Sequence, residues 1–133
     1  MRKLKQILGV VTTAVVVLVG TGGVAMASNN SVQSVTSCPS WMLSAYTACA
    51  NTLTSVNLRA RATSQSGYIV TIPNGYPFGL DCWTTGETIN GDNVWYYGLY
   101  QHDENAVPVF TYGWVTGYWL STGHDPAPQI AHC

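Results

Sequence analysis

Four cysteines are the residues of this sequence with the clearest capacity for chemistry. They are Cys38, Cys49, Cys82 and Cys133, and three pairings into two disulfides are possible. A zinc site or a thiol nucleophile is the alternative, but these cysteines lack the close Cys-Cys or Cys-His spacing of common zinc motifs. We therefore expect disulfides. Our preferred pairing closes a short loop from Cys38 to Cys49 and ties the C-terminal tail to a central strand from Cys82 to Cys133.

The other titratable side chains form no recognised catalytic motif. The run His-Asp-Glu at 102–104 offers metal ligands, but adjacent residues on an extended loop do not converge on one ion by themselves, so we expect no metal site. No serine lies in a Gly-x-Ser-x-Gly elbow and no His-Glu-x-x-His occurs. Paired carboxylates for acid-base catalysis would require Asp81, Glu87 and Asp92 to meet in space. We expect no cofactor and no enzymatic activity.

Positive charge is scarce outside the first residues of the chain. Residues 28–133 contain Arg59 and Arg61, no lysine and six acidic side chains, and so carry a formal charge of −4 with histidine neutral. Proteins that bind polyanions show a basic patch or stripe, so nucleic acid and anionic lipid are excluded as expected partners. A guanidinium can instead clamp one carboxylate through two parallel hydrogen bonds. For Arg59 we favour a structural role instead, in which it hydrogen-bonds loop carbonyls or pairs with an acidic neighbour.

The first 27 residues are typical of a targeting segment. Arg2, Lys3 and Lys5 are followed by a mostly apolar run at 7–19 and by Ala-Met-Ala at 25–27. The apolar run is shorter than the roughly 20 residues that a bilayer-spanning helix needs. We expect a signal peptide over 1–27, removal on export, no membrane attachment afterwards, and a secreted protein that is extracellular or associated with the cell wall.

The remaining chain reads as an N-terminal extension followed by short strands. Residues 28–51 form the extension, with a cysteine-closed loop. Within it we expect a short helix at 39–48, the alternative being an irregular pinned loop, and this piece acts either as a lid or as an aromatic contact surface. We expect strands at 55–60, 68–72, 77–83, 94–100 and 110–115, with polar loops at 84–93 and 101–109. The first and last of these strands should pair. The sequence thus predicts an all-β fold, either a small barrel or a sandwich, over 52–133 with a C-terminal tail.

Four stretches of the sequence resemble the bacterial SH3-like domain family. They are Val56-Asn57-Leu58-Arg59, Tyr68 to Ile72 with Pro73-Asn74-Gly75, Trp95-Tyr96-Tyr97-Gly98, and Gly113-Trp114-Val115 with Tyr118 and Leu120. The order and spacing of the stretches carry the resemblance, which covers about residues 52–121. It implies a small SH3-like, partly open barrel that serves exported proteins as a non-catalytic binding module, often for peptidoglycan or its peptide stems.

Aromatic residues are abundant among the side chains of this sequence that could contact a ligand. Exposed rings can stack on sugars or grip a peptide, whereas the alternative is packing inside the barrel. Strand alternation places Trp95, Tyr97 and Leu99 on one face and Val94, Tyr96 and Tyr100 on the other. The expected ligand-binding residues are Arg59, Tyr68, Trp83, Trp95, Tyr97 and Trp119.

The leading functional hypothesis is a secreted, monomeric, disulfide-stabilised SH3-like module. It would bind peptidoglycan, another envelope component or a peptide. The alternative is an extracellular interaction protein, such as a toxin or a protease inhibitor, that uses the two polar loops and the Cys38 to Cys49 segment. A small hydrolase would need an acid and a base that converge.

Overall fold

The computed structural model describes residues 34–133, which form a compact all-β unit. Its elements are β1 (Thr36–Ser37), β2 (Ala48–Asn51), β3 (Val56–Arg59), β4 (Tyr68–Ile72), β5 (Pro77–Ile89), β6 (Asp92–Glu104), β7 (Val107–Thr116) and the 3-10 turn η2 (Gly117–Trp119). The expected signal peptide at 1–27 lies outside the described residues. Among residues 34–133 there is no helix long and apolar enough to span a membrane.

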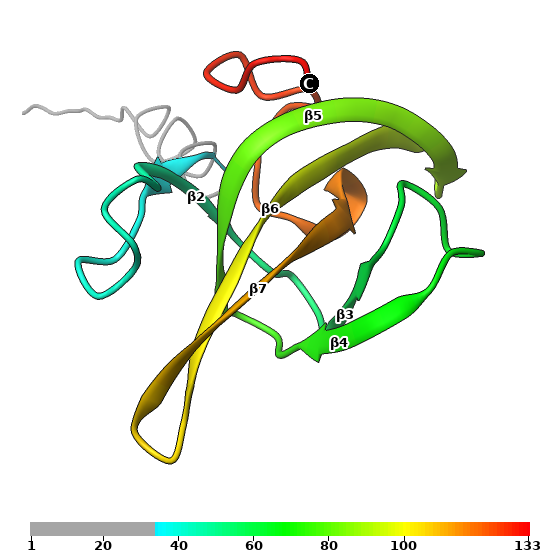
Figure 1. Cartoon of the computed structure of the whole chain (residues 1–133). Helices are drawn as coiled ribbons and strands as arrows, with labels where there is room; N and C mark the ends of the chain where they lie inside the picture. Colours follow the sequence, from blue (N-terminus) through cyan, green and yellow to red (C-terminus); the bar gives the residue numbers. More distant parts are fainter. Residues whose placement is uncertain (1–33) are drawn as a thin grey trace, which may run out of the picture. The chain divides into compact units, whose positions relative to one another are not determined.

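One antiparallel sheet contains all seven strands in the order β1-β2-β5-β6-β7-β3-β4. The sheet curls strongly but is not closed (Figure 1). The expected pairing of the first and last strands is confirmed, because Arg59 of β3 lies opposite Trp114 of β7 and Thr52 bridges to Leu120. The all-β class and the disulfide-pinned N-terminal segment are likewise confirmed.

The two central hairpins are longer than the sequence predicts. The expected loops at 84–93 and 101–109 are wrong, since β5, β6 and β7 continue through them to two tight turns. Asn90 and Gly91 have φ values of 49° and 90°, and Asn105 and Ala106 have values of 52° and 65°. Two consecutive positive φ angles are typical of the type I′ turn that closes a two-residue hairpin loop.

The β6–β7 hairpin extends past the rest of the sheet. β6 pairs with β5 only as far as Leu99 opposite Gly79, and the only β7 residue that pairs with β3 is Trp114. Residues 102–109, which we call the arm, therefore project away from the other strands (Figure 1). The arm places Asp103 and Pro108 directly opposite one another.

The core lies on the inner face of the curled sheet. Val94, Tyr96 and Tyr100 of β6 are buried there with Phe78 and Leu58, as the predicted alternation of β6 requires. The neighbouring strands approach closely at Gly98, where a Cβ atom would overlap the carbonyl oxygen of Gly79. A side chain at position 98 would thus force β5 and β6 apart.

Residues 38–49, which we call the N-terminal segment, pack on the outer face of the sheet. The expected helix at 39–48 is wrong, because the segment consists of turns that lead into β2. Met42 and Cys49 bury Leu99 of β6 in a second, smaller cluster, with Tyr46 packed against it. The Cys38–Cys49 disulfide closes this segment after 11 residues and so favours a compact loop over a regular helix.

Both disulfides have the pairing that we expected. Cys38 is bonded to Cys49, and Cys82 of β5 is bonded to Cys133 at the C-terminus. The tail adds to the free edge of β5, since Trp83 N donates to Ala131 O at 3.0 Å and Cys133 N donates to Trp83 O at 2.9 Å. Two disulfides indicate an oxidising environment such as the extracellular space.

Candidate functional site

Arg59 ends β3 on the outer face of the sheet, beside a pair of aromatic rings. Residues directly opposite in an antiparallel pair point to the same face, and the pairs Arg59–Trp114 and Tyr97–Trp114 place these three side chains in one row across β3, β7 and β6. The ring centroids of Tyr97 and Trp114 are 5.3 Å apart. The row gives this face a cation next to a broad aromatic surface.

A groove of about 240 Å³ opens at Arg59, and we call it the Arg59 groove. Trp95 and Trp119 form apolar walls of the groove. Thr116 also lines it and is paired with Trp95 in the β6–β7 ladder. Trp95 is 2% exposed and its indole Nε1 donates to Glu87 O at 2.8 Å. The remaining lining residues are Ser55, Val56, Asn57, Ser64 and Ile89. The groove thus combines a guanidinium with fixed aromatic walls.

Hydrogen bonds hold the loop after β3 in place around this groove. Arg59 Nη1 donates to Ser66 O at 3.2 Å, which is the loop-carbonyl bond expected as its structural alternative. Glu87 Oε1 accepts three hydrogen bonds, from Ser64 N at 2.6 Å, Ser64 Oγ at 2.7 Å and Thr63 Oγ1 at 2.9 Å. These bonds, with a smaller contribution from the charge of Arg59, lower the pKa of Glu87. Glu87 is therefore a firmly ionised anchor of the loop.

Arg59 makes no ion pair among residues 34–133, where the single recorded pair joins His102 and Glu104. A guanidinium has five N–H donors, and the one bond to Ser66 leaves donors for a ligand. A carboxylate bound there would form charge-assisted hydrogen bonds. The geometry of the groove therefore fits an anionic group attached to an apolar or extended body.

The structure brings three of the six expected ligand-binding residues together, namely Arg59, Trp95 and Trp119. Tyr97 lies next to them in the Arg59 row. Tyr68 of β4 is paired with Arg59 in the β3–β4 ladder and so extends this row to the edge strand. Only Trp83 lies elsewhere, where it packs edge-on against His132 with centroids 4.3 Å apart. Tyr68 is 58% exposed.

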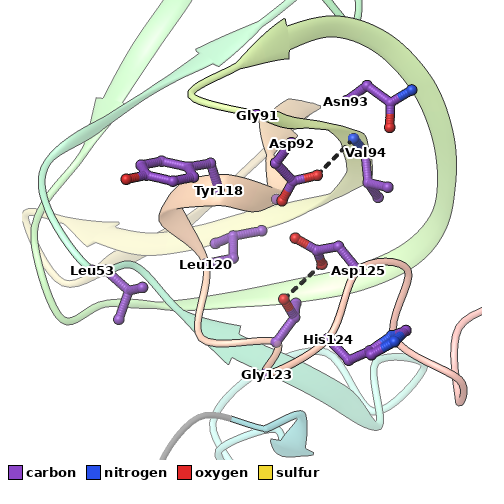
Figure 2. A pocket seen from close by; sticks show the side chains of 12 residues that line it. Leu53, Gly91, Asp92, Asn93, Val94, Tyr118, Leu120, Gly123, His124 and Asp125 are labelled. Atoms are coloured by element: carbon purple, nitrogen blue, oxygen red, sulfur yellow. Dashed lines mark hydrogen bonds between the residues drawn. The ribbon is translucent and has the colours of Figure 1, made fainter.

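A second concave site, of about 410 Å³, lies where the β5–β6 turn meets the loop after η2. Figure 2 shows Asp92 and Asp125 facing one another there. Asp125 Oδ1 accepts hydrogen bonds from Tyr96 Oη and from Thr122 Oγ1, both at 2.7 Å. A Cβ atom at Gly117 would lie 2.5 Å from Asp125 Oδ2, so only glycine at 117 leaves room for this carboxyl group.

The proximity of Asp125 favours the protonated form of Asp92. Burial first, and the bond to Asp125 second, raise the pKa of Asp92 to about 6, against the opposing effect of the Val94 N–H that donates to Asp92 Oδ1 at 2.9 Å. The sequence prediction named other partners for Asp92. Asp81 instead accepts a bond from Tyr46 Oη, and Glu87 anchors the loop at Ser64.

Replacing Asp92 with asparagine should change how stability depends on pH. The folded-state pKa of Asp92 is raised, so its stabilising contribution is complete below about pH 4 and is lost as pH rises to about 6. Asp92→Asn keeps a neutral hydrogen-bonding group, and it should raise stability at pH 7.5 by about 1 kcal/mol after allowance for solvent screening. The melting temperature should rise by about 5 °C.

Differential scanning calorimetry of both proteins from pH 4 to 8 checks this expectation. The difference between them isolates Asp92 from other titrating groups, and Asp81→Asn serves as a control carboxylate on a different strand segment. Equal melting temperatures for wild type and Asp92→Asn at pH 7.5 would show that the two carboxyl groups do not interact.

The remaining candidates of the sequence analysis fall on the arm. The His102 ring stacks on Tyr100 with centroids 4.5 Å apart, and its Nε2 lies 3.2 Å from Glu104 Oε2. Among residues 34–133 no three His, Cys, Asp or Glu side chains are grouped so that they could hold a metal ion. The run at 102–104 is part of a strand and its end, not a loop.

Comparison with family models, with curated proteins and with solved structures finds no match to this chain. The resemblance to the bacterial SH3-like domain therefore stays a prediction from the four sequence stretches within residues 52–121.

Proposed function

We propose that the protein is a secreted, non-catalytic binding module of the SH3-like type. Its ligand would be peptidoglycan or a related envelope peptide, held in the Arg59 groove by a carboxylate of the peptide stem. The observation that carries this proposal is that Arg59, Trp95 and Trp119 line one groove. Residues 28–133 contain only one other arginine and no lysine, so a cation at the mouth of a groove is a distinctive feature.

The charge of the groove favours an anionic ligand of small size. Arg59 supplies one positive charge with donors to spare, and Arg61 is exposed two residues further along the same loop. A polyanion needs many such contacts, whereas a single carboxylate needs one guanidinium. Trp119, which is half-buried at the groove, would pack against the apolar part of the same ligand, whereas Trp95 is buried and supports the groove wall.

Binding fits the groove better than catalysis does. Glu87 is the carboxylate held beside it, and three hydrogen bonds to Oε1 keep its pKa low. A general acid or base works best with a pKa near the operating pH, which these bonds oppose. We therefore assign Glu87 the role of fixing the loop that frames the groove.

Retention on insoluble peptidoglycan tests the proposal. The oxidised protein lacking residues 1–27 should sediment with purified peptidoglycan, and bound protein should increase to saturation with concentration. An unrelated acidic protein of similar size is the control. Retention no greater than that of the control contradicts the proposal and directs attention to a protein partner, for which inhibition of a protease panel is the next measurement.

A further inference from the structure

We infer that a second pocket, separate from the Arg59 groove, binds an alkylammonium group such as a lysine side chain or a quaternary amine. It has a volume of about 580 Å³ and lies between the N-terminal segment and the arm. Its lining residues are Trp41, Tyr76, Gln101, Asp103 and Pro108. We call it the Trp41 pocket.

The backbone at Trp41 is fixed by a buried amide. Gln101 is 6% exposed, its Nε2 donates to Trp41 O at 2.9 Å, and its Oε1 accepts from Leu43 N at 2.9 Å. Between these two bonds the Met42 side chain is buried against Leu99. The Cys38–Cys49 disulfide closes the same segment. Trp41 is thus held in place without being buried itself.

The ring of Trp41 is presented to solvent at the rim of the pocket. It is 51% exposed, and a large exposed ring on a rigid backbone is typical of a binding surface. The Tyr76 ring lies beside it, with centroids 6.1 Å apart, and Tyr76 Oη donates to Gln101 O at 2.9 Å. Both rings are therefore positioned before any ligand arrives.

A carboxylate completes the pocket on the side of the arm. Asp103 lies two residues after Gln101 on β6 and so shares its face, and Pro108 is directly opposite Asp103 on β7. Asp103 is exposed and makes no ion pair among the described residues. Its charge, after the larger effect of burial, raises the pKa of the Tyr76 phenol, which places the two groups near one another.

An anionic carboxylate beside two aromatic rings selects a cation. The face of an aromatic ring attracts an ammonium group within about 6 Å of its centroid, and Asp103 would add a direct ion pair. The pocket contains no basic side chain that could compensate Asp103. An anionic ligand would be repelled, and a neutral sugar would leave the charge of Asp103 unused.

Nuclear magnetic resonance titration of the oxidised protein tests the inference. The probes are Nα-acetyl-lysine methylamide and tetramethylammonium, and the neutral control is Nα-acetyl-norleucine methylamide, which matches the lysine derivative in its carbon chain. Both cations should shift the indole N–H signal of Trp41, assigned by its loss in Trp41→Phe, whereas the neutral control should not. A shift by the lysine derivative alone also supports the inference and identifies a peptide side chain as the ligand.

Two substitutions locate the cation. Asp103→Asn should weaken binding of both cations about tenfold, and Asp81→Asn, a carboxylate outside the pocket, should leave it unchanged. Arg59→Gln should also leave it unchanged, so the outcome is independent of the function proposed above. Equal binding of the norleucine derivative, binding of an N-acetylglucosamine oligomer but of neither cation, or no effect of Asp103→Asn overturns the inference.

Discussion

Replacing both Cys82 and Cys133 with serine is expected to lower the free energy of unfolding by about 4 kcal/mol. The bond spans 51 residues, and on the chain-entropy model a longer closed loop restricts the unfolded chain more strongly. The loss is a large share of the 5–15 kcal/mol typical of a domain. It would also release the tail, whose backbone pairs with β5 at Trp83.

Urea unfolding without reductant measures this effect. Replacing Cys38 and Cys49 with serine is the matched comparison, because its loop spans only 11 residues and the expected loss is about 3 kcal/mol. A loss below about 1 kcal/mol for the Cys82 and Cys133 variant would contradict the expected role of the long loop.

Arg59→Gln is expected to weaken ligand binding at the Arg59 groove roughly thirtyfold, or by about 2 kcal/mol. A hydrogen bond to a charged group contributes about 1.5–3 kcal/mol, and every 1.4 kcal/mol corresponds to about a factor of ten in affinity. Glutamine keeps a polar group at this position but provides neither the charge nor the planar fork of donors. The measurement is the dissociation constant for solubilised peptidoglycan fragments.

Arg61→Gln is the matched control for Arg59→Gln. Arg61 carries the same charge two residues away but does not line the groove, so its replacement should change affinity less than twofold. Arg59→Lys restores the charge without the fork and should recover part of the affinity. Because Arg59 also bonds Ser66 O, circular dichroism must show an unchanged fold. Equal effects of Arg59→Gln and Arg61→Gln would mean that only net charge matters.

The strand positions could be predicted from the sequence, but the strand lengths could not. Alternation of apolar and polar residues predicted β3, which buries alternate side chains, and β-branched and aromatic residues predicted β4. Residues 84–88 of β5 are Thr-Thr-Gly-Glu-Thr and none of them is buried, so they have the composition of a loop. These residues form a strand because they pair with β6. A strand that buries neither face has no alternation of apolar and polar residues, so the sequence carries no sign of it.

The candidate sites divide in the same way. Arg59, Trp95 and Trp119 could be proposed because a guanidinium and aromatic rings are recognisable as residue types, and the fold then placed them together. Asp92 and Asp125 face one another although they are 33 positions apart in the sequence. No local motif connects them, so this pair could not be predicted. The Trp41 pocket was missed because its backbone clamp, Gln101, was expected in a loop.

Recognition of a peptide carboxylate by the Arg59 groove is the central functional claim for this protein. Tryptophan fluorescence titration with peptidoglycan stem peptides, one with a free C-terminal carboxylate and one amidated, tests this claim directly. The free peptide should change the fluorescence to saturation and bind at least tenfold more tightly than the amidated peptide, and Arg59→Gln should remove this preference. Equal binding of the two peptides, or a preference that survives in Arg59→Gln, would contradict the account.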